Sequence, residues 1–86
     1  MSYYVYILRS ERLQKYYCGQ TDNLNIRLER HNACKVKSTK HGVPWICVGF
    51  IECFSRSAAM ELEMQIKKRG IDRWLNENPT RISLFK

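Results

Sequence analysis

The sequence has no long apolar run, although 44% of its 86 residues are hydrophobic. No stretch approaches the roughly 18 consecutive apolar residues of a membrane-spanning helix, so we predict no such helix. The first residues, Met1-Ser2-Tyr3-Tyr4, also lack the basic segment and the cleavage site of a secretory signal peptide. We therefore expect a cytoplasmic protein. Its length predicts one domain that covers residues 1–86.

Acidic residues are scarce, because 8 Asp and Glu stand against 15 Lys and Arg and leave a net charge of +7. A basic excess of this size favours a polyanionic partner, and nucleic acid is the commonest one in the cytoplasm. The side chains that we expect to contact DNA are Lys35, Lys37, Lys40, Lys67 and Lys68. The alternative for these lysines is that they serve solubility alone.

Several common motifs are missing. The four cysteines are not expected to form disulfides outside a secreted protein, and most of them lie in apolar runs where free cysteine packs as a small hydrophobe. The set His31, Cys34, His41 and Cys47 lacks the paired spacing of a zinc site. There is also no glycine-rich phosphate loop, no His-Glu-x-x-His and no Ser-His-Asp set. These absences remove the commonest hydrolase motifs.

The residue pattern predicts strands and helices in the order β-β-α-β-α-(α). Aromatic and β-branched residues predict a hairpin over residues 3–9 and 15–19, and the apolar run at 45–54 predicts a buried central strand. Helical spacing and end signals predict helices over residues 23–32, 57–69 and 72–78. The expected fold is therefore an α/β domain with a small, three-stranded, mainly antiparallel sheet flanked by helices.

The two longer helices have distinct stripes. In the first, Thr21 or Asp22 is the expected N-cap, and Arg27 and His31 lie one turn apart on a stripe beside an apolar one. In the second, Ser57 is the expected N-cap. Its packing stripe is predicted to consist of Ala59, Leu62 and Ile66, with Glu63 at the edge.

The reactive side chains on these elements are Tyr6, Tyr17, Arg27, His31 and Glu63. Such a set suits cleavage of a phosphodiester bond. Arginine neutralises charge that grows on phosphate oxygens, a carboxylate holds a hard divalent ion, and tyrosine or histidine accepts a proton from water. Taken singly, each of these residues is better explained by packing or by a solvated helix face, and only the five together favour an active site.

From Tyr3 to about Asn78 the chain resembles the GIY-YIG endonuclease domain, in particular the short members similar to the N-terminal nuclease module of an excinuclease. The two family triplets correspond to Tyr4-Val5-Tyr6 and Tyr17-Cys18-Gly19. Further matches are the run from Gly19 to Leu24, Arg27, Leu28, His31 and Asn32, and the segment from Ser57 to Lys68. Tyr4 and Cys18 depart from the family pattern, and its late asparagine corresponds to Asn76 or Asn78.

The resemblance implies a metal-dependent endonuclease that hydrolyses DNA, leaves 5′-phosphate and 3′-hydroxyl ends, and acts in DNA repair or recombination. It implies that Tyr6 and Tyr17 line the scissile phosphate and that Arg27 contacts it. Glu63 would hold a single Mg²⁺ or Mn²⁺, and His31 would assist proton transfer through Tyr6. Arg27 and the metal are expected to lower the pKa of Tyr6.

Structured or branched DNA is the expected partner, and no membrane is. Because one active site cuts one strand, double-strand cleavage would need a homodimer or a protein partner. The alternatives that remain are a non-catalytic nucleic-acid-binding module with the same fold and a purely structural domain. A purely structural domain would show no salt-dependent DNA binding.

Overall fold

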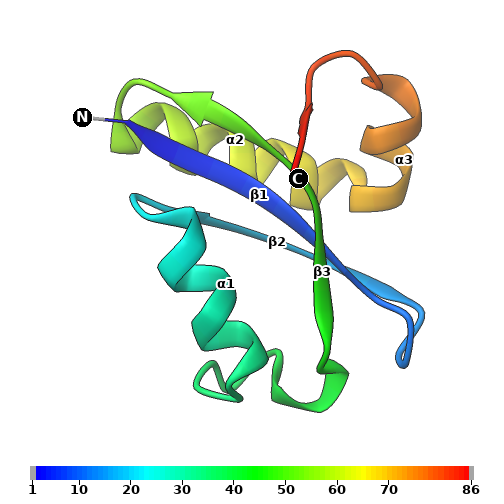
Figure 1. The fold of residues 1–86 in the computed structure, drawn as a ribbon. Coiled ribbons are helices and arrows are strands. Elements are labelled where there is room, and N and C mark those ends of the chain that lie inside the picture. Colours follow the sequence, from blue (N-terminus) through cyan, green and yellow to red (C-terminus); the bar gives the residue numbers. More distant parts are fainter. Residues whose placement is uncertain (1, 86) are drawn as a thin grey trace.

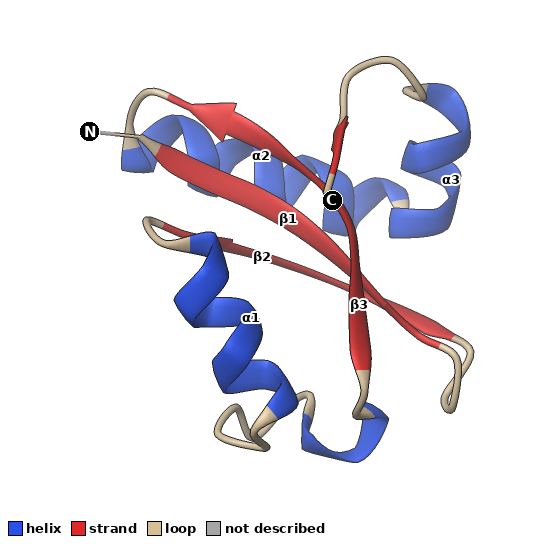
Figure 2. Cartoon of the chain, viewed as in Figure 1, coloured by secondary structure: helices blue, strands red, loops and turns tan. Residues whose placement is uncertain are grey.

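The computed structural model describes residues 2–85, and its centre is a four-stranded sheet in the order β2-β1-β3-β4. All three strand pairings are antiparallel. The strands are β1 (Tyr3–Ser10), β2 (Lys15–Thr21), β3 (Trp45–Cys53) and the short β4 (Ser83–Leu84). The helices are α1 (Leu24–Asn32), the 3₁₀ turn η1 (Lys40–Gly42), α2 (Arg56–Arg69) and α3 (Ile71–Glu77). The predicted α/β class with an antiparallel sheet flanked by helices is confirmed (Figures 1 and 2), but the sheet has four strands and not the predicted three, because the C-terminal segment Ser83–Leu84 pairs with β3.

The sheet separates two apolar cores. On one face, Val5, Ile7 and Cys18 pack against Ala59, Leu62 and Ile66 of α2 and Trp74 of α3. On the other face, Tyr6, Leu8, Trp45 and Cys47 form a core with α1, to which Leu24 and Leu28 contribute. Figure 1 shows α1 and α2 on opposite sides of the strands. The predicted packing stripe of α2 is therefore confirmed.

The central strand is β1, because it pairs with both β2 and β3 along its whole length. The predicted strand over residues 45–54 is also interior, because β3 lies between β1 and β4 in the sheet. Beyond β1, the partner of β3 is β4, and the two pair only at Gly49 and Phe50. The side chain of Ile46 is 61% exposed, so β3 is only partly buried and the prediction of a buried strand holds in part.

Both predicted N-caps shift by one or two residues. Asn23 caps α1, since its Oδ1 accepts a hydrogen bond from the backbone N–H of Ile26 at 3.1 Å. Ser55 caps α2, since its Oγ accepts from the N–H of Ala58 at 3.0 Å. An N-cap needs extended backbone and an oxygen that reaches the third N–H of the helix, which Ser57 cannot offer because it lies inside the first turn.

Gly70 ends α2 as predicted. Its φ of 95° lies in the region that favours glycine, and its N–H donates to the carbonyl of Ile66 at 3.0 Å. Within residues 2–85, no helix has both the length and the apolar character that crossing a membrane requires.

Candidate active site

The predicted site residues meet around the edge strand β2. Tyr6 lies on β1 and Tyr17 on β2, while Arg27 and His31 come from α1 on one face of the sheet. Glu63 comes from α2 on the other face. Because β2 has only one neighbouring strand, side chains from both faces can reach past its free edge. The site is therefore assembled from four separate elements.

Tyr6 and His31 form the buried centre of this site. The Oη of Tyr6 lies 2.8 Å from Nε2 of His31, and the two residues are 1% and 0% exposed. The position opposite Tyr6 in the hairpin is Gly19. A Cβ on Gly19 would lie only 2.6 Å from that Oη, so the absence of a side chain makes room for the hydroxyl. This contact gives a physical reason for glycine in the second triplet.

Arg27 approaches the same hydroxyl from α1. Its Nε–H donates to Oη of Tyr6 at 3.3 Å. Burial nevertheless raises the pKa of Tyr6 to about 12, and the lowering effect of the Arg27 hydrogen bond is smaller. Arg27 does lower the pKa of Tyr6, as expected, but burial raises it by more, so the net shift is upward. Tyr6 is thus a neutral phenol at pH 7.

His31 has a second partner on its other ring nitrogen. Nδ1 lies 2.7 Å from Oγ1 of Thr39, a residue that is only 1% exposed. Burial lowers the pKa of His31 to about 4, and the positive charges of Arg27 and Arg30 lower it further. The imidazole is therefore neutral at pH 7. With one protonated and one bare nitrogen, it can donate a hydrogen bond to one partner and accept one from the other.

Thr39 is a site residue that the sequence analysis missed. It lies in the segment between α1 and β3, whose basic, turn-rich sequence is typical of a solvated loop, so the sequence did not indicate a buried threonine there. The loop is held in place by Trp45, whose Nε1–H donates to the carbonyl oxygen of Thr39 at 2.6 Å. Asn32 adds a second tie, because its side chain bonds both the N–H and the carbonyl of Trp45, at 2.6 and 3.0 Å.

Tyr17 lies between the buried pair and α2. Its ring centroid is 5.1 Å from that of His31 and 6.3 Å from that of Tyr6. The Nζ of Lys67 lies 5.9 Å from the centre of the Tyr17 ring. Tyr17 therefore connects the histidine to the charged residues of α2.

Glu63 is the carboxylate of the site, and its side chain is 19% exposed. Its Oε2 lies 2.7 Å from Nζ of Lys67, one helical turn away. The bond with Glu63 raises the pKa of Lys67, which keeps the ammonium charged. Within residues 2–85, the Glu63 carboxylate makes no further side-chain hydrogen bond or ion pair beyond the one with Lys67. One carboxylate oxygen is thus paired and the other is open.

A divalent ion would have to rely on Glu63 and on non-protein ligands. No group of three or more His, Cys, Asp or Glu side chains suited to a metal occurs within residues 2–85. Mg²⁺ commonly keeps several waters and is held by one or two carboxylates together with phosphate oxygens. A single, partly exposed carboxylate at an open edge fits that behaviour. It does not fit zinc, which needs a closed set of protein ligands.

The predicted DNA-contacting lysines fall into two groups. Lys35, Lys37 and Lys40 are exposed on the segment between α1 and β3. Lys67 and Lys68 are exposed near the end of α2, and of these two Lys67 bonds the site carboxylate. A further cation, which the sequence analysis did not select, is Arg56 at the start of α2. It lines a cavity of about 350 Å³ together with Arg27 and Gln20.

The two candidates for the late asparagine differ in their surroundings. Asn78 ends α3, and its Nδ2 donates to the carbonyl of Trp74 at 2.9 Å. Asn76 is exposed on the same helix. Asn78 therefore has a structural task in capping α3.

Fold and site together define an α/β domain with a tyrosine, arginine, histidine and glutamate cluster at the open edge of its sheet. The family model described as the GIY-YIG catalytic domain matches residues 2–75. The chain belongs to the GIY-YIG family, whose domains are nuclease domains that act on DNA.

A solved structure covers nearly the whole chain. It is the solution NMR structure of the UPF0213 protein BH0048 from Bacillus halodurans, with 27% sequence identity and a TM-score of 0.56. The match covers 99% of this chain and 100% of that one. A search of curated proteins found no match. The small size of the domain is thus shared with at least one solved relative.

Proposed function

We propose that the protein is a metal-dependent endonuclease that hydrolyses DNA phosphodiester bonds, with Tyr6, Tyr17, Arg27, His31 and Glu63 as its catalytic residues. The observation that carries the proposal is the chain of contacts from Arg27 through Tyr6 to His31, at 3.3 and 2.8 Å. Packing alone would not require a buried phenol to meet both a cation and a neutral imidazole.

In this proposal Arg27 binds the scissile phosphate. Its guanidinium is partly exposed and lines the cavities on both sides of the β2 end. A fixed positive charge there stabilises the charge that develops on the phosphate oxygens, an effect worth about 10²–10³ in rate for a single donor. Arg56 supplies a second cation to one of those cavities.

Tyr6 and His31 act as a proton relay. A free phenolate is unfavourable because the pKa of Tyr6 is about 12. We propose instead that Oη of Tyr6 accepts the proton of the attacking water while its own proton passes to Nε2 of His31. His31 ends as an imidazolium, which the negative charge of the bound phosphate favours. The water oxygen then bonds to phosphorus while the bond from phosphorus to the 3′-oxygen breaks, one proton has passed from water to histidine, and the leaving 3′-oxygen takes up a proton from solvent water.

Glu63 is the proposed ligand of a single Mg²⁺ or Mn²⁺. Such an ion would supply Lewis-acid polarisation of the phosphate and would lower the pKa of bound water. Oε1 is the open oxygen for it, and Lys67 would have to release Oε2 for a closer contact. The wider roles that we propose are cleavage of structured or branched DNA and a place in repair or recombination.

The test is a cleavage assay with labelled single-stranded, duplex, flap and branched DNA in Mg²⁺, Mn²⁺ or EDTA. We expect metal-dependent nicking that Glu63→Ala and Arg27→Ala abolish. Glu61→Ala is the matched control, because Glu61 is an exposed glutamate of the same helix outside the site. Nicking that survives Glu63→Ala would overturn the proposed role of the carboxylate.

The second candidate is a DNA-binding module that does not cut. The observation in its favour is the ion pair of Glu63 with Lys67. Glu63 is the only carboxylate among the predicted site residues, and this ion pair engages one of its two oxygens. Salt-dependent binding without cleavage of every substrate would support this candidate. The tyrosines would then be structural residues.

A further inference from the structure

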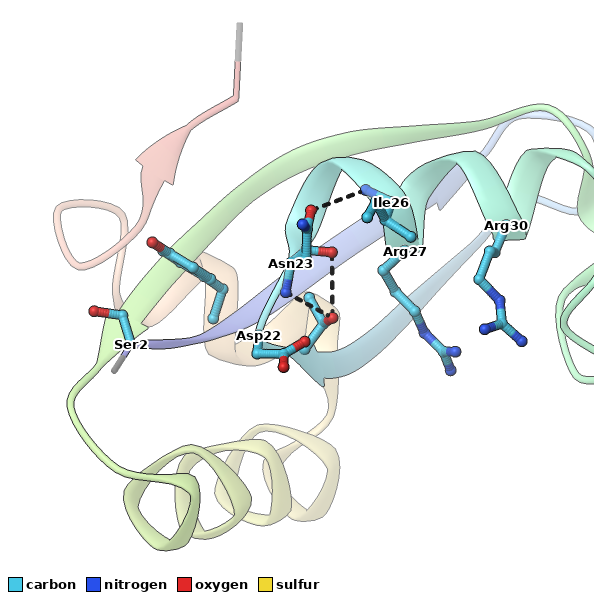
Figure 3. A pocket seen from close by; sticks show the side chains of 8 residues that line it. Ser2, Asp22, Asn23, Ile26, Arg27 and Arg30 are labelled. Carbon is cyan, nitrogen blue, oxygen red and sulfur yellow. Dashed lines mark hydrogen bonds between the residues drawn. The ribbon is translucent and has the colours of Figure 1, made fainter.

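A shallow pocket lies beside Arg27, at the start of α1. Its volume is about 730 Å³, and its lining includes Tyr4, Asp22, Asn23, Ile26, Arg27 and Arg30. Figure 3 shows Arg27 and Arg30 projecting from the same flank of α1, with Asp22 and Asn23 at the N-terminal end of the helix. Arg27 belongs both to this pocket and to the candidate active site. A ligand in the pocket would therefore lie next to the group that Arg27 binds.

The lining combines three kinds of chemistry. Arg27 and Arg30 supply positive charge on one wall. Ile26 supplies an apolar surface that is 55% exposed, and the half-buried ring of Tyr4 is held edge-on by Phe50 at a centroid distance of 5.8 Å. Ile26 and Tyr4 therefore offer an apolar contact surface beside the two arginines.

Asp22 and Asn23 supply the third kind of chemistry, which is hydrogen bonding. The Oδ1 of Asn23 is used to cap the helix, at 3.1 Å from the N–H of Ile26, so its amide group remains as a donor. The carboxylate of Asp22 repels phosphate, but it accepts hydrogen bonds from the amino groups of bases. A carboxylate in this position is therefore expected to face a base rather than a phosphate.

These three parts match the parts of one nucleotide, which has an anionic phosphate, two apolar faces and a polar edge. The volume also falls in the range of small-molecule sites, about 300–1,000 Å³. A base inside a continuous duplex cannot present its faces, because they are covered by its stacked neighbours. Leaving the stack costs a few kcal/mol, and the cost is least for a mismatched or single-stranded base.

We propose that this pocket receives one unstacked nucleotide adjacent to the phosphate bound by Arg27, with its phosphate on Arg30 and its base against Ile26 and Tyr4. This inference rests on the proposed function and specifies its substrate class. The preferred DNA then has an unpaired or weakly paired nucleotide beside the cut, as in a flap, a bubble or a single strand. Continuous duplex is the poorer substrate.

The experiment measures the contribution of the base to binding. A series of flap DNAs is prepared, each with one abasic analogue at a different nucleotide around the mapped cut. If nothing is cut, the analogues are placed around the junction of single and double strand. Binding is measured by fluorescence anisotropy with the Glu63→Ala protein in EDTA, so that cleavage plays no part. Loss of one stacked base is expected to weaken binding about tenfold at one position.

Two charge-matched variants on the Glu63→Ala background decide whether the pocket is responsible. Ile26→Glu places a carboxylate in the pocket, whereas Asn25→Glu adds the same charge at an exposed neighbour outside it. We expect the tenfold abasic effect to persist in Asn25→Glu and to disappear in Ile26→Glu. An equal effect in both variants, or none in the parent protein, would overturn the inference.

The outcome separates this inference from the proposed function. Nicking by the wild-type protein without any abasic effect leaves the endonuclease in place and removes the nucleotide pocket. An abasic effect that depends on Ile26, in a protein that cuts nothing, supports the pocket and removes the endonuclease.

Discussion

The Oγ1 of Thr39 lies 2.7 Å from Nδ1 of His31, and both side chains are buried. Oγ1 also lies 3.4 Å from the carbonyl oxygen of Val36, to which its hydroxyl donates. Oγ1 is then left as an acceptor for the His31 Nδ1–H. With that proton on Nδ1, Nε2 is bare and faces Tyr6. Thr39 thereby selects the tautomer that can receive the proton of Tyr6.

Replacement of Thr39 is therefore expected to change the tautomer of His31. Thr39→Val keeps the shape but leaves Nδ1–H without an acceptor, at a cost of about 1–3 kcal/mol. The ¹⁵N spectrum of His31 is expected to show the Nδ1–H form in wild type and more of the Nε2–H form in the variant, with nicking reduced about 100-fold. Thr39→Ser is expected to restore both. An unchanged tautomer in Thr39→Val would contradict this role.

Gly19→Ala is expected to impair the relay more than the fold. The new Cβ would meet Tyr6 Oη at 2.6 Å and its Cζ at 2.8 Å, so the ring must shift away from His31. We expect about a 100-fold loss of nicking, the lower end of the acid–base contribution.

The control for Gly19→Ala is Gly70→Ala. That position has a φ of 95° and no atoms near the new Cβ, so the substitution is expected to cost about 1–3 kcal/mol of unfolding free energy without affecting nicking below the melting point. Nicking rates and urea unfolding of both variants provide the comparison. Equal nicking by Gly19→Ala and wild type would refute the steric argument.

Lys67 is expected to compete with the divalent ion for Glu63. The ammonium lies 2.7 Å from Oε2, and the pair is partly exposed, so its removal is worth well under 1 kcal/mol. Lys67→Met is therefore expected to tighten Mn²⁺ binding about threefold in an electron paramagnetic resonance titration. Lys68→Met removes the same charge from the neighbouring residue and is expected to change the affinity less. Weaker Mn²⁺ binding by Lys67→Met would show that Lys67 supports the ion.

His31 is expected to make stability depend on pH. Its pKa is about 4 in the folded protein, against an ordinary value of 6.5. Between these values the unfolded chain binds a proton that the folded chain does not, so the unfolding free energy falls as the pH falls from 6.5 towards 4. The slope from this residue is at most about 1.4 kcal/mol per pH unit.

Urea unfolding at pH 7 and pH 5 measures this loss. Carboxylates also titrate at low pH, so His31→Gln is the reference that retains their contribution. We expect the wild-type protein to lose more stability than His31→Gln over this interval. Equal losses would mean that His31 is not held neutral by burial.

Local patterns predicted most of the elements. The stripe of Ala59, Leu62 and Ile66 lies in the core as its spacing indicated, and Gly70 ends the helix. The exact caps were not predictable, because Ser55 and Ser57 have the same chemistry and differ only in backbone conformation. The order of the strands, with β1 between β2 and β3, was also not predictable, since it depends on pairing between segments far apart in the chain.

The sequence by itself determined the fold class and the residue types available for chemistry, because helical and strand periodicity and the two tyrosine triplets are local features of the chain. Only the tertiary structure decided how those residues meet. Burial set the protonation of Tyr6 and His31, and the fold of a basic loop brought Thr39 to the imidazole. Both effects arise from desolvation and contact between distant segments, which depend on packing in three dimensions.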